Sequence, residues 1–100
     1  MVRAREVTGA DRAQAERFVR DWLGSYVAGA AAPTGMMLTA YGRRSTDLEG
    51  RVFLASALSH VTETDDLHRA SVTHPGCVVV PVALLLGRDG AVSGHEVLRA

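Results

Sequence analysis

Apolar residues in the first third of the chain recur with the period of an α-helix. Aromatic side chains return every fourth residue, with aliphatic side chains directly beside them, at Phe18, Trp22 and Tyr26. Because this spacing forms one stripe on a helix of 3.6 residues per turn, the pattern predicts a helix over 10–28. Thr8 and Asp11 are predicted to cap its N-terminus. Gly24 is expected to cost about 1 kcal/mol relative to alanine and to admit a close neighbouring helix.

Two further segments before the middle of the chain have helical patterns. A short apolar piece at 36–41 precedes a polar loop at 42–50, in which Asp47 is placed to cap the next element. Residues 48–61 are small or apolar on nearly every side. Such a segment is typical of a helix that is buried on most of its surface.

The apolar run at 77–87 has two possible interpretations. Its three consecutive valines favour a strand by propensity. Pro81 would sit badly in a central strand but is tolerated in the first turn of a helix, so we predict a helix that follows a turn at 75–76. Ser93 and Glu96 form the S-x-x-E pattern of a capping box, which predicts one more helix start. The predicted fold class is therefore all-α.

Composition limits the classes of partner. The chain has 11 basic and 11 acidic side chains and a formal net charge of zero. Without a basic excess, binding to nucleic acid or to an anionic membrane has no electrostatic support. All the basic residues are arginines, which clamp carboxylates but accept protons poorly, so this sequence offers no lysine chemistry.

Cysteine usage and the N-terminal sequence predict a cytoplasmic location. Cys77 is the only cysteine and cannot form an internal disulfide, as expected in a reducing compartment. The N-terminal residues are polar and lack the apolar core of a signal peptide. The longest apolar run has about half the length that a membrane span requires.

Polar functional groups are densest at 60–77. This segment holds three carboxylates, three imidazoles and one arginine between two apolar segments. It could be a pocket for carboxylate substrates, with Arg69 as a cation and His74 as a proton carrier. It could also be a metal site of Asp and His, or a set of groups that cap helices and face solvent. The spacing matches neither H-E-x-x-H nor a Cys/His pattern, so we predict no metal site.

An ordered set of short motifs runs through 54–100. E-x-D-D-x-H at 63–68 is followed by H-P-G at 74–76, by an apolar run with an early proline, and by S-G-x-E-x-L-x-A at 93–100. Together they resemble the N-terminal helical domain of the MmgE/PrpD family, which includes 2-methylcitrate dehydratases, cis-aconitate decarboxylases and iminodisuccinate epimerases. A weaker resemblance extends over 18–29.

The resemblance implies roles for individual residues. His74 matches the family's active-site histidine and is expected to carry a proton or bind substrate. Asp65 and Asp66 match its paired aspartates and are expected to orient neighbouring groups. Glu63 falls where some members, the decarboxylases among them, have an active-site aspartate. Glu63 is therefore expected to bind substrate, together with Arg69 from the pocket interpretation.

Two departures from the family pattern bear on the reaction. Leu67 stands where those members have a threonine, and the spacer to His74 is one residue longer. They make cis-aconitate decarboxylation less expected and leave dehydration and epimerisation open. The shared chemistry that the resemblance implies is proton removal next to a carboxylate of a small polycarboxylate, with no metal or organic cofactor. His95 and Cys77 are assigned to structure or solvent.

Members of the family are several times longer and place catalytic lysines and a tyrosine downstream. The chain over 1–100 is therefore expected to be a truncated part of the helical domain that is inactive alone and either folds poorly or self-associates. The resemblance also implies a homodimer. A non-catalytic helical binding module is the alternative hypothesis, and an isolated small enzyme is the least favoured.

Overall fold

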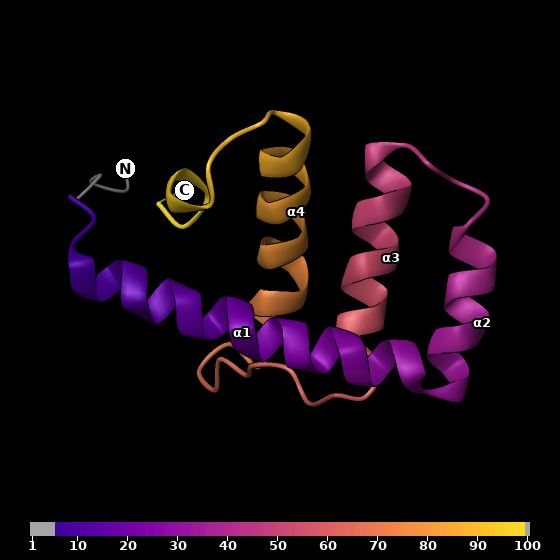
Figure 1. Cartoon of the computed structure of the whole chain (residues 1–100). Helices are drawn as coiled ribbons and strands as arrows, with labels where there is room; N and C mark the ends of the chain where they lie inside the picture. Colours follow the sequence, from indigo (N-terminus) through magenta and orange to yellow (C-terminus); the bar gives the residue numbers. More distant parts are fainter. Residues whose placement is uncertain (1–5, 100) are drawn as a thin grey trace.

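Five helices make up the part of the chain that the structure describes. The computed structural model describes residues 6–99, with α1 (Gly9–Ala31), α2 (Pro33–Gly42), α3 (Leu48–His60), α4 (Pro75–Asp89) and α5 (Gly94–Val97). No strand occurs within residues 6–99, which confirms the all-α prediction. In Figure 1, α2, α3 and α4 stand in a row along α1. The central helix α3 contacts α1, α2 and α4, and α5 contacts α4.

The predicted starts of α1, α3 and α5 are confirmed by their capping contacts. At α1, the Thr8 side chain accepts from the Asp11 backbone N–H at 3.2 Å, and Asp11 accepts from the Thr8 backbone N–H at 2.9 Å. Asp47 caps α3 with its carboxylate. Ser93 and Glu96 form the predicted capping box at α5. Each contact gives a backbone N–H at a helix end the partner that the helix itself cannot supply.

The close approach of α1 and α3 occurs at Gly29. A Cβ on Gly29 would lie 1.8 Å from the backbone oxygen of Leu58, so only glycine allows this crossing. A Cβ on Gly24 would meet nothing within 4 Å, so the prediction of a close approach at Gly24 is wrong. The buried residues of α1 are Trp22, Ser25 and Gly29.

The predicted apolar stripe of α1 is only partly covered. Trp22 is buried and stacks on Tyr26 with ring centroids 5.4 Å apart. Phe18, Leu23 and Val27 remain exposed. The helical period of the apolar residues predicted α1 correctly, but it did not show how much of the apolar face is covered by other helices.

The apolar run at 77–87 lies in α4, which confirms the helical interpretation over the strand. The predicted turn at 75–76 is wrong, because Pro75 occupies the first turn of α4, where its missing N–H costs no helical hydrogen bond. Pro81 lies inside the helix rather than in its first turn, so it cannot donate to the carbonyl of Cys77. Pro81 is nevertheless fully buried, so packing holds the helix around it.

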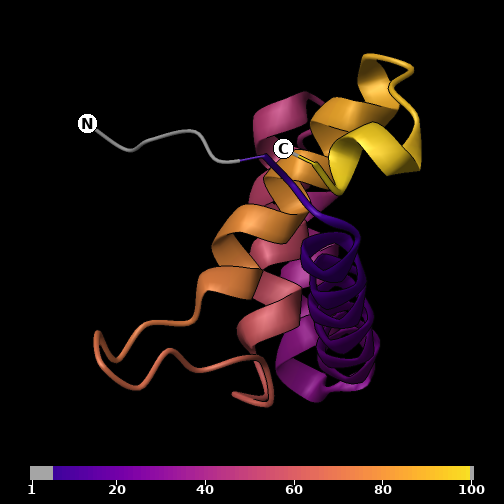
Figure 2. The ribbon, with the colours of Figure 1, turned by 90° about the vertical axis from the view of Figure 1, so that its left-hand side faces the viewer.

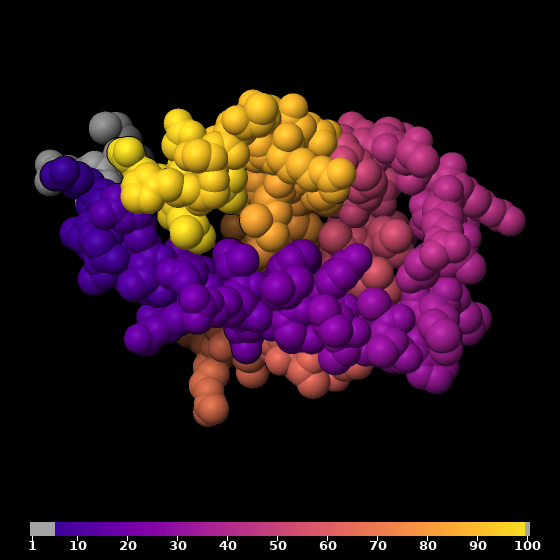
Figure 3. Space-filling model, viewed as in Figure 1, coloured from indigo at the N-terminus to yellow at the C-terminus, as the bar shows by residue number. Residues whose placement is uncertain are grey.

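The helices leave much apolar surface uncovered. Only four hydrophobic residues of the described range are buried: Trp22, Leu58, Cys77 and Val80. The radius of gyration is 14.3 Å, whereas a compact chain of this length has about 13 Å. A groove of about 440 Å³ lies between α1, α4 and α5, and Figure 3 shows a hollow there. Within residues 6–99, no helix is both long and apolar enough to cross a membrane.

Candidate functional site

The loop between α3 and α4, residues 61–74, carries most of the predicted site. Figure 2 shows this loop projecting to one side of the helices. Thr64 donates a hydrogen bond to Ser25 on α1 at 3.3 Å, which fixes the first part of the loop. Further along, the backbone N–H of His68 donates to the carbonyl of Thr73 at 2.8 Å and closes a tight turn. One hydrogen bond therefore joins the loop to α1, and the other closes its second half on itself.

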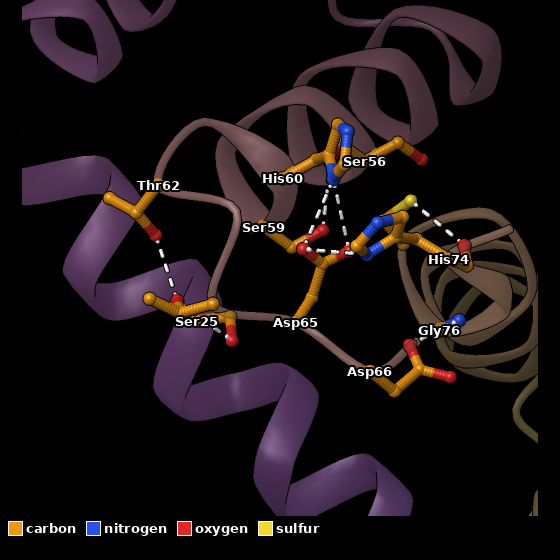
Figure 4. A network of polar contacts seen from close by, with 11 residues as sticks. Ser25, Ser56, Ser59, His60, Thr62, Asp65, Asp66, His74 and Gly76 are labelled. Atoms are coloured by element: carbon orange, nitrogen blue, oxygen red, sulfur yellow. Dashed lines mark hydrogen bonds and ion pairs between the residues drawn. The ribbon is translucent and has the colours of Figure 1, made fainter. Parts of the chain in front are cut away.

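Asp65 lies at the centre of the cluster that Figure 4 shows. Its side chain is 1% exposed. The Nδ1 atom of His60, the last residue of α3, lies 3.0 and 3.1 Å from the two carboxylate oxygens of Asp65. The Nδ1 atom of His74, which directly precedes α4, lies 3.4 Å from the nearer oxygen. One buried carboxylate is thus flanked by imidazoles from two helix ends.

The contacts of Asp65 determine the tautomer of His60. An ionised carboxylate only accepts hydrogen bonds, so Nδ1 of His60 donates and Nε2 is left as an acceptor when the ring is neutral. His74 differs, because its Nδ1 is buried and makes no hydrogen bond within residues 6–99. Its 3.4 Å contact with Asp65 is too long for a good hydrogen bond and is attractive when the ring is protonated. The two rings meet edge to face, 4.7 Å apart.

Cys77 adjoins the same cluster from the first turn of α4. Burial raises the pKa of the Cys77 thiol, and the nearby negative charge of Asp65 raises it further. The thiol also donates to the backbone carbonyl of His74 at 3.1 Å. These effects favour the protonated thiol, so Cys77 is a poor nucleophile.

Asp66 faces a different partner from Asp65. Its Oδ1 accepts a hydrogen bond from the backbone N–H of Gly76 at 2.8 Å, so it satisfies one of the free N–H groups at the start of α4 (Figure 4). A Cβ on Gly76 would lie 2.4 Å from that oxygen, so the contact requires glycine. Asp66 therefore positions the helix that follows His74.

Glu63 and Arg69 are not brought into the cluster. Both are exposed on the loop, and within residues 6–99 neither makes a hydrogen bond or ion pair with Asp65 or the two imidazoles. Glu63 has a left-handed backbone with φ 51°, which is uncommon for a residue other than glycine. Arg69 lies in the tight turn closed by His68 and Thr73.

Sequence reasoning missed His60 and Cys77 as members of this cluster. His60 was one of three histidines in the polar segment, and nothing in its spacing showed which of them would meet Asp65. Cys77 follows His74 by three residues, a spacing at which two residues lie on the same face of a helix. That spacing was the one signal that could have placed Cys77 beside the cluster.

These features define a helical domain in which a loop joins a buried carboxylate to the histidine before a helix. The family model of the MmgE/PrpD N-terminal domain matches residues 2–100, and the chain belongs to this family. The match confirms the resemblance drawn from 54–100 and extends it over nearly the whole chain. No curated protein and no solved structure matches the chain.

Proposed function

We propose that this chain is the helical part of an enzyme that removes or returns a proton next to a carboxylate of a small polycarboxylate. The observation that carries the proposal is the buried Asp65 carboxylate held between Nδ1 of His60 and Nδ1 of His74. Imidazole is the side chain best suited to exchange protons near neutral pH. Water elimination and epimerisation both begin with this step.

The proposal gives each residue a distinct task. His74 carries the proton, and Asp65 and His60 fix its ring. Asp66 acts indirectly, because it fixes the start of α4 directly after His74. Glu63 and Arg69 are exposed on the same loop and contact the substrate at the rim of the site.

Two features of the family extend the proposal. The proposed proton transfer uses protein side chains alone, without an organic cofactor, and the whole protein works as a cytoplasmic homodimer. The finding that no helix within residues 6–99 is suited to span a membrane is compatible with that setting.

Deuterium exchange tests the proposal without knowledge of the final reaction. The full-length protein is incubated in D₂O with a panel of small polycarboxylates, and loss of the C–H signal next to a carboxylate is followed by proton NMR. We expect His74→Ala to slow exchange by about 10²- to 10⁴-fold, the usual contribution of a general acid–base group. His95→Ala, on α5, is the matched control and is expected to exchange at the wild-type rate. Equal rates for His74→Ala and the wild type would contradict the proposal.

The apolar groove favours a second candidate function, a non-catalytic binding module. Its lining comes from α1, α4, residues 97–98 and loop residues 66–68, and is formed mainly by apolar side chains, among them Phe18, Val79 and Leu98. Such a surface fits the apolar face of an amphipathic helix. A binding module would lose its partner on Val79→Glu and keep it on His74→Ala, whereas the proton-transfer enzyme shows the reverse dependence in the exchange assay.

A further inference from the structure

Three hydrogen-bonded side chains lie on the exposed turn at 68–73, apart from the cluster around Asp65. Nδ1 of His68 lies 2.6 Å from Oγ of Ser71, and Oγ of Ser71 lies 2.7 Å from Oγ1 of Thr73. The hydrogen bond from the His68 backbone N–H to the Thr73 carbonyl closes the same turn. A serine hydroxyl is therefore held between an imidazole and a second hydroxyl.

The count of hydroxyl protons sets the direction of these contacts when the neutral His68 ring accepts through Nδ1. Ser71 has one O–H proton, and once it donates that proton to Nδ1, its Oγ is left to accept from the Thr73 hydroxyl. The imidazole is then placed to take the Ser71 proton, and the hydrogen bond from Thr73 stabilises the negative charge that develops on Oγ. A hydroxyl with a base at hydrogen-bond distance is the arrangement of an activated nucleophile.

The turn presents Ser71 to solvent in a fixed geometry. Ser71 is exposed, so an incoming molecule can reach its Oγ. The next residue, Val72, has a left-handed backbone with φ 53°, which is unusual for a β-branched side chain. Such strained residues persist where surrounding contacts hold them, and they cluster at functional sites.

The apolar groove adjoins this turn, because His68 belongs to the lining of the groove as well as to the turn. The groove has a volume of about 440 Å³ and apolar walls that include Phe18 and Val79. An acyl chain in the groove therefore has its carbonyl end beside the His68–Ser71 pair. Asp66 lines the groove too, and its negative charge disfavours a free carboxylate there and favours an uncharged ester.

We propose that Ser71 is a nucleophile that is acylated by neutral esters with an apolar acyl group, with His68 as its general base. Oγ of Ser71 forms a bond to the ester carbonyl carbon, and the bond between that carbon and the alcohol oxygen breaks. The Ser71 proton passes to Nδ1 of His68 and then to the departing alcohol oxygen, so the products are acyl-serine and a neutral alcohol. The inference is independent of the proposed proton transfer, because it uses no atom of His60, Asp65 or His74.

The activated ester p-nitrophenyl octanoate tests the nucleophile. We expect the full chain to release one nitrophenol per chain in a burst, and to gain one octanoyl group that peptide mass spectrometry locates on Ser71. Ser71→Ala is expected to abolish both signals. His68→Ala is expected to slow the burst about a hundredfold, at the low end of the contribution of a general base. His95→Gln, on α5, controls for direct reaction of the ester with an imidazole and is expected to react as the wild type does.

The length of the acyl chain tests the groove. Each CH₂ group that enters an apolar groove is expected to raise the rate of acylation by up to about fourfold, so the octanoate ester should react faster than the acetate ester. Val79→Glu is expected to remove this preference and to leave the reaction with the acetate ester unchanged. Met37→Glu, which is exposed on α2 outside the groove lining, is the matched control and is expected to keep the preference.

Two outcomes would overturn the proposal. An octanoyl group on a residue other than Ser71, or an unchanged burst in Ser71→Ala, would rule out this nucleophile. A preference for octanoate that persists in Val79→Glu would rule out the groove as the site of the acyl chain. Because Ser71, His68 and Val79 are all exposed, their variants are expected to keep the wild-type circular dichroism, and loss of labelling then reports chemistry and not unfolding.

Discussion

Asp65 and Asp66 are neighbours in the chain, but their carboxylates serve different partners. Asp65 is buried between the imidazoles of His60 and His74, and Asp66 accepts the backbone N–H of Gly76. Adjacent residues in an irregular segment can point in opposite directions, so a D-D pair can connect two elements at once. A substitution at one aspartate therefore tests a different contact from a substitution at the other.

Replacement of Asp66 is expected to affect α4 rather than proton transfer. Asp66→Ala removes the acceptor for the Gly76 N–H and is expected to lower the free energy of unfolding by about 0.5–2 kcal/mol, as loss of an N-terminal cap does. Asp66→Asn keeps an acceptor oxygen and is expected to retain most of that stability. Urea unfolding followed by circular dichroism measures both. A loss of stability as large in Asp66→Asn as in Asp66→Ala would show that the charge matters more than the hydrogen bond.

Two glycines of α1 provide a matched test of helix packing. Gly29→Ala would place a Cβ 1.8 Å from the Leu58 carbonyl oxygen. We expect it to destabilise the fold by at least about 3 kcal/mol, at the upper end of overpacking costs. Gly24→Ala meets nothing within 4 Å and is expected to stabilise α1 by about 0.5–1 kcal/mol through helix propensity. Thermal melts of the two variants should move in opposite directions, and a stabilised Gly29→Ala would contradict the α1–α3 crossing.

At the candidate site, the sequence singled out residues only where a motif contained them. The family motif singled out Asp65 and His74, and the structure places them 3.4 Å apart. His60 and Cys77 could not be selected in this way, since their approach depends on where α3 ends and where α4 begins. The sequence predicted a close approach at Gly24, whereas the contact geometry places it at Gly29, where a Cβ would meet the Leu58 backbone.

At the scale of elements, local signals determine where helices begin more firmly than where they end. The capping contacts at α1, α3 and α5 were all predicted. The helix predicted from residue 48 does begin there, at Leu48, so the polar loop predicted at 42–50 is limited to the residues between Gly42 and Leu48. The start of α4 at Pro75 was missed because a Pro-Gly pair is usually a turn, yet proline also fits the first helical position.

The cap of α3 is expected to make stability depend on pH in acid. The hydrogen bond from the Gly50 backbone, and then that from the Ser45 hydroxyl, lower the pKa of Asp47 below its ordinary value of 3.8. A depressed folded-state pKa means that the stabilisation is complete above the unfolded pKa and is lost as pH falls through the folded one.

Asp47→Asn tests this dependence, because its amide caps the helix without titrating. We expect the melting temperature of the wild type to fall more than that of Asp47→Asn below about pH 4, near the ordinary carboxyl pKa. Melts of both proteins between pH 7 and pH 2 measure the difference. Asp89 and Glu96, whose pKa values are also lowered, are common to both and cancel. Parallel curves would contradict the proposed contribution of the cap.

At the scale of the molecule, the uncovered apolar surface is the main departure from an ordinary small domain. Exposed side chains include Phe18, Met37, Val78 and Val79, and the groove between α1, α4 and α5 gathers several apolar residues. Binary patterning predicts which residues avoid water but not which element covers them. The all-α class was therefore predictable, whereas the open groove was not.

The purified chain is expected to self-associate through this groove. Val79→Glu places a charge in its lining and is expected to shift the chain towards monomer in sedimentation velocity at increasing concentration. Val72→Glu, on the exposed loop and outside the groove, is the matched control and is expected to leave association unchanged. A wild-type chain that stays monomeric at every concentration would contradict this prediction.

The tether formed by the aspartate pair has a consequence for motion. Asp65 contacts His60 at the end of α3, and Asp66 accepts the Gly76 N–H at the start of α4. Because the two aspartates are adjacent, outward motion of the loop breaks both contacts together. Hydrogen–deuterium exchange at the Gly76 amide then reports the opening of the loop, and any substrate that binds at Asp65 is expected to slow this exchange, although it does not contact Gly76.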